Sequence, residues 1–163
     1  MKFIADVMLG KLAKRMRLLG MDVQYDRTRS DNELIRVALE QNRFILTRDR
    51  ALSERPLAAR HLFIRSDLVQ DQLSQVIAAF PAEPTRPFTR CSSCNGTLAQ
   101  IAKSEARDLV PSHVYDTCDA FLICGNCGRT YWEGTHAQRI RSLLTAWTQK
   151  PGSCSDPGPA KKR

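Results

Sequence analysis

The chain has 163 residues, of which 42% are hydrophobic and 26% are charged, a composition that fits one or two small globular domains. Lys and Arg number 25 against 17 Asp and Glu, and the resulting net charge of +8 favours a polyanionic partner. No apolar run is long enough to span a bilayer, and charged residues interrupt the first apolar segment, which argues against a secretory leader. We therefore expect a cytoplasmic protein with no membrane partner.

Short apolar runs alternate with segments of helical periodicity through the first 80 residues. The expected strands are residues 3–7, 22–25, 43–47 and 61–65. The expected helices cover residues 8–19, a segment that begins at Ser30, and residues 69–80. Ser30 and Glu33 have the spacing of a capping box, and Gly20 stands where helices commonly end. The alternation predicts an α/β fold with a parallel sheet and crossover helices.

Acidic residues follow the expected strands. Asp6 ends the first run within FIADV, Asp49 follows the third and Asp67 follows the fourth, while Asp31 and Glu33 open the second helix. Because the carboxyl ends of parallel strands share one edge, these carboxylates are expected to converge. Such oxygen ligands suit Mg²⁺ or Mn²⁺, which can activate water for phosphodiester hydrolysis. The catalytic residues predicted on this basis are Asp6, Asp31, Asp49 and Asp67.

Each of these acids except Asp6 has a ready structural alternative. Asp31 could simply favour the first turn of its helix, and Glu33 could be one arm of the capping box. Asp67 could begin a helix, and Asp49 could cap the turn after its strand. Asp6 is harder to explain in this way, because a charge amid apolar residues is costly to bury without a partner.

Basic residues stand near the acids in the sequence. Lys11, Lys14 and Arg15 share one face of the first expected helix, and Arg48 and Arg50 flank Asp49. They are predicted to bind the phosphates of a nucleic acid on either side of the acidic site. The alternative for the helix face is that it is simply solvated.

Four cysteines, two CxxC pairs separated by 29 residues, form the second constellation. This spacing predicts a zinc ribbon whose structural Zn²⁺ is held by Cys91, Cys94, Cys124 and Cys127, with residues 103–119 as an inserted loop. A redox role is the alternative for either pair alone. Arg129 and Arg139 lie near the second pair and are predicted to contact RNA. The neighbouring aromatic residues Tyr131 and Trp132 could stack bases or pack the core of the ribbon.

Three prolines in residues 81–87 indicate a break between two units. The expected organisation is a nuclease domain over residues 1–80, a linker over 81–90, a zinc ribbon with a C-terminal helix over 91–148, and a disordered tail over 149–163.

Several motifs together resemble one known family. FIADVMLGKLAKRMRLLGMDVQYD, SDNEL, LTRD, RCSSCNG and CGNCGRTYWEGTH closely resemble the Mut-seven C-terminal (Mut7-C) RNase family, PIN-like domains that carry a zinc ribbon. The resemblance implies a three-layer α/β/α nuclease fold with Mg²⁺ or Mn²⁺ at acidic residues. Asp6, Asp31 and Asp49 match the acids of the family's motifs, and Asp67 falls where PIN domains often place a fourth.

These patterns favour a metal-dependent ribonuclease, expected to act as an endoribonuclease, with the zinc ribbon assisting RNA binding. The main alternative is a non-catalytic adaptor that binds RNA or the ribosome through a structural zinc ribbon. A phosphatase of small phosphoesters is a third reading. RNA is the expected partner, and both a homodimer and a ribosomal or RNA-processing partner stay open.

Overall fold

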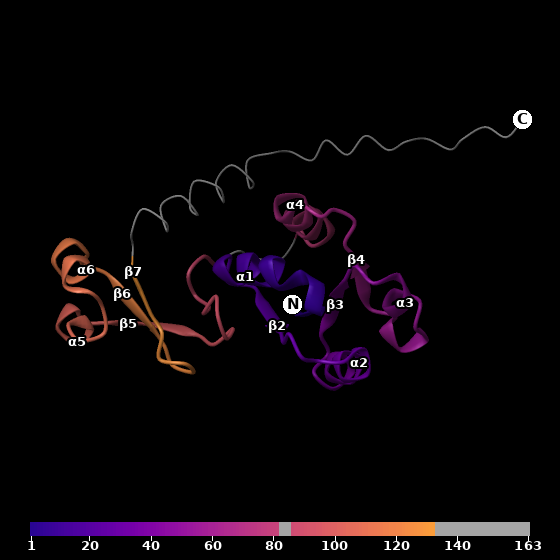
Figure 1. Cartoon of the computed structure of the whole chain (residues 1–163), viewed down its shortest axis with the longest axis horizontal. Helices are drawn as coiled ribbons and strands as arrows, with labels where there is room; N and C mark the ends of the chain where they lie inside the picture. Colours follow the sequence, from indigo (N-terminus) through magenta and orange to yellow (C-terminus); the bar gives the residue numbers. More distant parts are fainter. Residues whose placement is uncertain (82–85, 133–163) are drawn as a thin grey trace, which may run out of the picture.

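The computed structural model describes residues 1–81 and 86–132, which fold around two separate sheets (Figure 1). We refer to residues 1–81 as the α/β unit and to residues 90–132 as the cysteine module. The expected C-terminal helix, with Arg139, and the expected tail lie outside the described residues. None of the helices within the described ranges has the length and apolar character needed to cross a membrane.

The α/β unit is built on a four-stranded sheet. Its strands are β1 (Lys2–Ala5), β2 (Asp22–Tyr25), β3 (Phe44–Thr47) and β4 (His61–Phe63). They lie in the order β2-β1-β3-β4 and every neighbouring pair is parallel, which confirms the predicted sheet. The chain crosses from β2 past β1 to β3, so the strand order reverses between β1 and β3. Ligands of open parallel sheets bind at the carboxyl ends of strands beside such a reversal.

Helices cover both faces of this sheet (Figure 1). They are η1 (Val7–Leu9), α1 (Gly10–Leu18), α2 (Asp31–Glu40), α3 (Arg50–Ser53), η2 (Pro56–Ala58) and α4 (Val69–Ala79). On one face Phe3 packs with residues of α1 and α4, and on the other Ile4 packs with residues of α2 and α3. Because neighbouring strand residues point to opposite faces, β1 anchors two cores at once. The unit is therefore a three-layer α/β/α fold; α3 and η2 were not predicted.

Local signals define the ends of two helices as predicted. Ser30 and Glu33 form the capping box, with the Glu33 N–H donating to Ser30 Oγ at 3.4 Å and the Ser30 N–H donating to Glu33 Oε2 at 3.0 Å. Gly20 follows α1 with φ +85°, a conformation that favours glycine. A Cβ atom on Gly20 would also lie 2.1 Å from the carbonyl oxygen of Arg86.

The segment that joins the two units packs against α1. The Arg86 N–H donates to the Leu19 carbonyl at 2.9 Å, and the Phe88 N–H donates to the Leu18 carbonyl at 3.1 Å. The Phe88 side chain lies against the core shared by α1 and α4. The described part of the expected linker is therefore held on the α/β unit by both its backbone and its side chains.

The cysteine module contains an antiparallel sheet in the order β5-β6-β7. Its strands are β5 (Leu98–Ile101), β6 (Phe121–Cys124) and β7 (Thr130–Trp132). The expectation of an inserted loop over residues 103–119 is wrong, because this segment forms α5 (Lys103–Ala106) and α6 (Ser112–Thr117). Ala106 and Val114 bury themselves against Phe121 of β6, so the insertion has a small apolar core of its own.

Candidate active site and metal centre

Asp6 follows β1 directly and is only 3% exposed. Its Oδ2 accepts a hydrogen bond of 2.9 Å from the hydroxyl of Thr47, the last residue of β3, which is fully buried. None of the ion pairs formed among the described residues involves Asp6. A buried carboxylate without a cationic partner is costly, which makes Asp6 the strongest candidate among the four acids for an ion ligand.

Asp49 is linked to Asp6 through the same hydroxyl. The Asp49 N–H donates to Thr47 Oγ1 at 2.9 Å, so Thr47 bridges the segments that follow β1 and β3. Asp49 Oδ1 caps α3 by accepting from the N–H groups of Ala51 at 2.8 Å and Leu52 at 3.3 Å. Asp49 therefore caps the turn after its strand, as the structural alternative predicted, and it does so through Oδ1. Its Oδ2 accepts no hydrogen bond from a residue in the described ranges. The two acids follow the neighbouring strands β1 and β3, between which the strand order reverses.

Asp31 and Asp67 already have arginine partners. Asp31, the first residue of α2, is paired with Arg55 Nη2 at 3.1 Å. The Asp67 side chain is 84% exposed and forms an ion pair with Arg48. Within residues 1–81 and 86–132, no three carboxylates or histidines bring ligand atoms within 4.8 Å of one another. Thr47 thus connects the Asp6 carboxylate to the backbone of Asp49, and the four acids form no compact cluster in the described residues.

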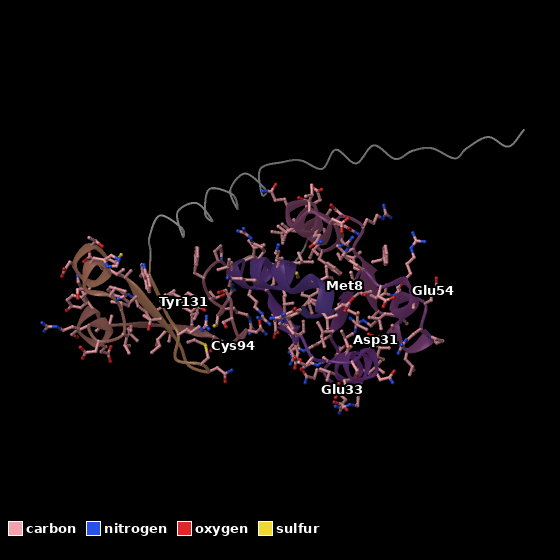
Figure 2. All side chains as sticks on the ribbon, viewed as in Figure 1. Met8, Asp31, Glu33, Glu54, Cys94 and Tyr131 are labelled. Atoms are coloured by element: carbon pink, nitrogen blue, oxygen red, sulfur yellow. The ribbon has the colours of Figure 1, made fainter. Side chains whose placement is uncertain are left out.

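Figure 2 places the acids relative to the cysteines. Asp31 and Met8 lie within the α/β unit, whereas Cys94 lies in the neighbouring cysteine module. Glu33 is held in its capping box with Ser30, which confirms the structural alternative for this residue. The two predicted metal sites are therefore separate.

The predicted phosphate-binding residues differ in what they contact. Arg48 is committed to Asp67, whereas the other described ones, Lys11, Lys14, Arg15, Arg50 and Arg129, are exposed or partly exposed. Lys11, Lys14 and Arg15 lie on α1, as expected.

Sequence reasoning missed three residues at this edge. Thr47 connects the Asp6 carboxylate to the backbone N–H of Asp49, and Arg55 holds Asp31. Arg29 precedes the capping Ser30, and its Nη1 is the one buried side-chain polar atom in the described residues that lacks a hydrogen-bond partner. A threonine that ends an apolar strand two residues before Asp49 was the available signal for Thr47. The two arginines carry no local pattern that distinguishes them from surface arginines.

The four cysteines form a site that fits zinc. Their Sγ atoms all lie within 4.8 Å of one another, with Cys91 3.7 Å from Cys127 and Cys94 3.4 Å from Cys124. A tetrahedral Zn²⁺ with Zn–S bonds of about 2.3 Å requires sulfur atoms about 3.8 Å apart. The observed spacing is therefore close to the geometry that a bound Zn²⁺ would impose.

The protonation chemistry of these thiols also favours a cation. Burial raises the pKa of Cys91. Hydrogen bonds from the Tyr131 hydroxyl at 2.9 Å and from backbone N–H groups outweigh this effect and lower the pKa to about 6. The Arg129 N–H lowers the pKa of Cys127, but burial and the three neighbouring thiols raise it to about 12. Closely packed thiolates resist ionising together unless a positive charge lies among them. A divalent ion would supply that charge.

Comparison with known families agrees with this geometry. The model of the Mut7-C RNAse domain matches residues 1–144. The chain belongs to the Mut7-C RNAse domain family. No curated protein and no solved structure matches it. Membership points to a nuclease of the ribonuclease type, with RNA as a substrate or partner, and it confirms the resemblance inferred from the motifs.

In this Mut7-C domain the first cysteine pair is attached to the edge strand of the α/β sheet. Arg17, which is 4% exposed, donates from Nε to the Val23 carbonyl at 2.8 Å and from Nη1 to the carbonyls of Ser92 at 3.3 Å and Ser93 at 2.7 Å. The Val23 N–H donates to Asn95 Oδ1 at 3.0 Å. Two side chains thus bind the outward backbone groups of β2, which protects an edge that would otherwise be open to pairing.

Proposed function

We propose that this Mut7-C chain is a metal-dependent ribonuclease that cleaves RNA internally at the edge between β1 and β3. The observation that carries the proposal is Asp6, a buried acid with no cationic partner in the described residues, whose partner Thr47 also accepts a hydrogen bond from the backbone N–H of Asp49. Family membership supports the same reaction class, since it points to a nuclease.

Asp6 and Asp49 are the residues proposed to hold Mg²⁺ or Mn²⁺, with Asp31 as a further ligand. Mg²⁺ commonly takes one or two carboxylates and keeps several waters, so a compact cluster of four acids is not required. When bound, such an ion lowers the pKa of a coordinated water and stabilises the charge that develops on the phosphate. The position of Asp6 and Asp49 at the strand reversal is where an open parallel sheet places its ligands.

The surrounding side chains have distinct proposed roles. Thr47 fixes the orientation of Asp6 by donating to Oδ2, and the capping bonds of Asp49 hold its Oδ1, which leaves Oδ2 for the ion. Arg55 restrains Asp31 through its ion pair, and Asp67 with Arg48 forms a second charged pair beyond β4. Lys11, Lys14, Arg15 and Arg50 are proposed to bind the phosphates that flank the cleaved bond.

The cysteine module is proposed to hold a structural Zn²⁺ and to assist RNA binding. Arg129 is exposed beside the second cysteine pair, where it could contact a phosphate. Tyr131 is less suited to stacking on a base, because its hydroxyl is bound to Cys91 and it belongs to β7.

The test is RNA cleavage by the full chain with Mg²⁺ or Mn²⁺, with Asp6→Asn and Asp49→Asn compared against Glu40→Gln. Glu40 is an exposed acid paired with Arg36 on α2 and lies outside the proposed site. Loss of an ion ligand should lower kcat/KM at least about a hundredfold, whereas the control should cleave like wild type. Circular dichroism and zinc content would show that all variants are folded. Equal cleavage by all variants, or RNA binding by wild type without turnover under any divalent ion, would refute the proposal.

A further inference from the structure

A polar hollow of about 480 Å³ lies at the opposite edge of the sheet from the acids. Its wall comes from residues at the start of β1 and β2, from the segments before β3 and β4, and from the cysteine module. The polar side chains that line it are Lys2, Asp22, Gln41, Asn42, Arg60 and Arg90. β1 separates this edge from Asp6, and four extended residues span about 13 Å. The hollow is therefore distinct from the proposed catalytic site.

The acidic member of the wall is already satisfied. Asp22 Oδ1 accepts from Arg43 Nη1 at 2.7 Å and from Asn95 Nδ2 at 2.8 Å, and Asp22 Oδ2 is paired with Arg90 at 3.4 Å. The Asp22 carboxylate therefore has three donor residues around it, one from the α/β unit and two from the cysteine module. It contributes little uncompensated negative charge to the hollow.

The amide oxygens of the wall are also occupied. Gln41 Oε1 accepts from Gln24 Nε2 at 2.9 Å and from Arg43 Nε at 2.8 Å, and Asn42 Oδ1 accepts from Arg60 Nη1. Each side-chain amide has one oxygen and one NH₂ group, so both residues retain their donors for the hollow. Asn42 adopts φ +52°, a conformation that Asn and Asp tolerate better than most residues.

With these acceptor atoms occupied, the groups of the wall that can contact a ligand are mainly hydrogen-bond donors and positively charged groups. The Lys2 side chain is exposed and forms no ion pair or hydrogen bond with another described residue, and Arg60 and Arg90 add two guanidinium groups. Three cationic side chains therefore line the hollow, beside Met1, against one carboxylate that is already paired. Such a site excludes cations and neutral acceptor-poor ligands, and it suits a small oxyanion with several acceptor atoms.

We propose that this hollow binds a phosphate group, either of a nucleic-acid strand or of free phosphate. Arg90 Nη1 donates to the Asn95 carbonyl at 3.0 Å, and Arg90 forms a β-bridge with Thr97, so the fold of the first cysteine pair positions this arginine. The site is thus completed by both units and depends on the cysteine module. It does not rest on the proposed ribonuclease activity, because none of its residues belongs to that site.

The sharpest test is Asn42→Asp in the zinc-loaded full chain. Aspartate keeps the oxygen that accepts from Arg60 and tolerates the same backbone conformation, but it replaces the NH₂ donor with a negative oxygen. Gln70→Glu is the matched control, because it adds the same charge at an exposed position of α4. Lys2→Ala is a second variant that removes an exposed charge with no protein partner.

Binding would be measured without added Mg²⁺ or Mn²⁺ for three probes: an oligoribonucleotide with a 5′-phosphate, the same strand with a 5′-hydroxyl, and inorganic phosphate. Asn42→Asp should weaken binding about tenfold and Lys2→Ala severalfold, with less than about twofold change for Gln70→Glu. An effect on both strands identifies a backbone phosphate, on the 5′-phosphate strand alone a terminal phosphate, and on inorganic phosphate alone a free ligand. If Asn42→Asp and Lys2→Ala match Gln70→Glu for every probe, the proposal is wrong, whatever the outcome for Asp6.

Discussion

Replacing Arg17 by methionine should destabilise both units at once. The Arg17 guanidinium bonds three backbone carbonyls, one on β2 and two in the loop between Cys91 and Cys94. Burial lowers the pKa of Arg17, while the nearby charges of Cys91 and Cys94 act in the opposite direction. Methionine keeps the apolar stem and volume but removes the donors and the charge, so the substitution isolates the polar interactions.

The size of the effect follows from the number of bonds and from their surroundings. A hydrogen bond from a charged donor contributes about 1.5–3 kcal/mol, and one buried and two partly buried carbonyls would lose such a donor. The variant no longer has to desolvate a guanidinium, which offsets several kcal/mol of that loss. We expect the free energy of unfolding to fall by about 2–4 kcal/mol. Zinc affinity should fall as well, because a positive charge beside the thiolates is removed.

Urea unfolding and competition with a zinc chelator measure these two effects. Lys14→Met is the control, because Lys14 is exposed on the same helix and its replacement should change stability by less than about 0.5 kcal/mol. If Arg17→Met and Lys14→Met unfold at the same urea concentration and hold zinc equally, then Arg17 does not couple the cysteine module to the sheet and the reasoning is wrong.

Three further predictions follow from the same contacts. The wild-type chain should contain one Zn²⁺ by elemental analysis, and Cys124→Ser should lose it together with about 10 kcal/mol of folding free energy in the module; full zinc content in the variant would contradict the site. Gly20→Ala should cost at least about 1–2 kcal/mol in urea unfolding, because φ is +85° and Arg86 blocks a Cβ, whereas Gly125→Ala, which meets nothing within 4 Å, should cost less. Burial raises the pKa of Asp22, but hydrogen bonds from Arg43 and Asn95 bring it below the usual value, so its stabilisation is present above about pH 4 and is lost as the pH falls through the folded-state pKa. The difference in unfolding free energy between wild type and Asp22→Asn should therefore shrink on acidification below that pH, and a constant difference would refute the assignment.

Much of the fold could be predicted because its signals are local. Alternating apolar runs predicted the parallel sheet, and the Ser30–Glu33 spacing predicted a capping box that the structure contains. Residues 103–119 were mistaken for a loop because their helices are short and bury few side chains, which leaves little periodicity to detect. The helices in this segment depend on a few side chains that pack on Phe121, a residue of another element that the local sequence does not reveal.

For the candidate active site, the sequence placed acids after the strands and favoured Asp6 and Asp49 as ion ligands, but it could not rank the acids by the partners that they have in the structure. The ranking depends on partners that lie far away in the chain: Asp31 meets Arg55, Asp67 meets Arg48, and Asp6 meets Thr47 without any basic residue. Whether a carboxylate is neutralised by an arginine or left to bind an ion is a matter of three-dimensional neighbours.

The sequence by itself determined the α/β class, the family and the four-cysteine site, because periodicity, motif and CxxC spacing are properties of nearby residues. The tertiary structure alone decided that the first cysteine pair covers the edge of β2 and that Lys2, Asn42, Arg60 and Arg90 share one hollow. These residues are separated by up to 88 positions between Lys2 and Arg90, and nothing local to any of them encodes the meeting. Lys2, Asn42 and Arg60 come together because the amino ends of parallel strands, like the carboxyl ends, share an edge, and Arg90 joins them through its ion pair with Asp22.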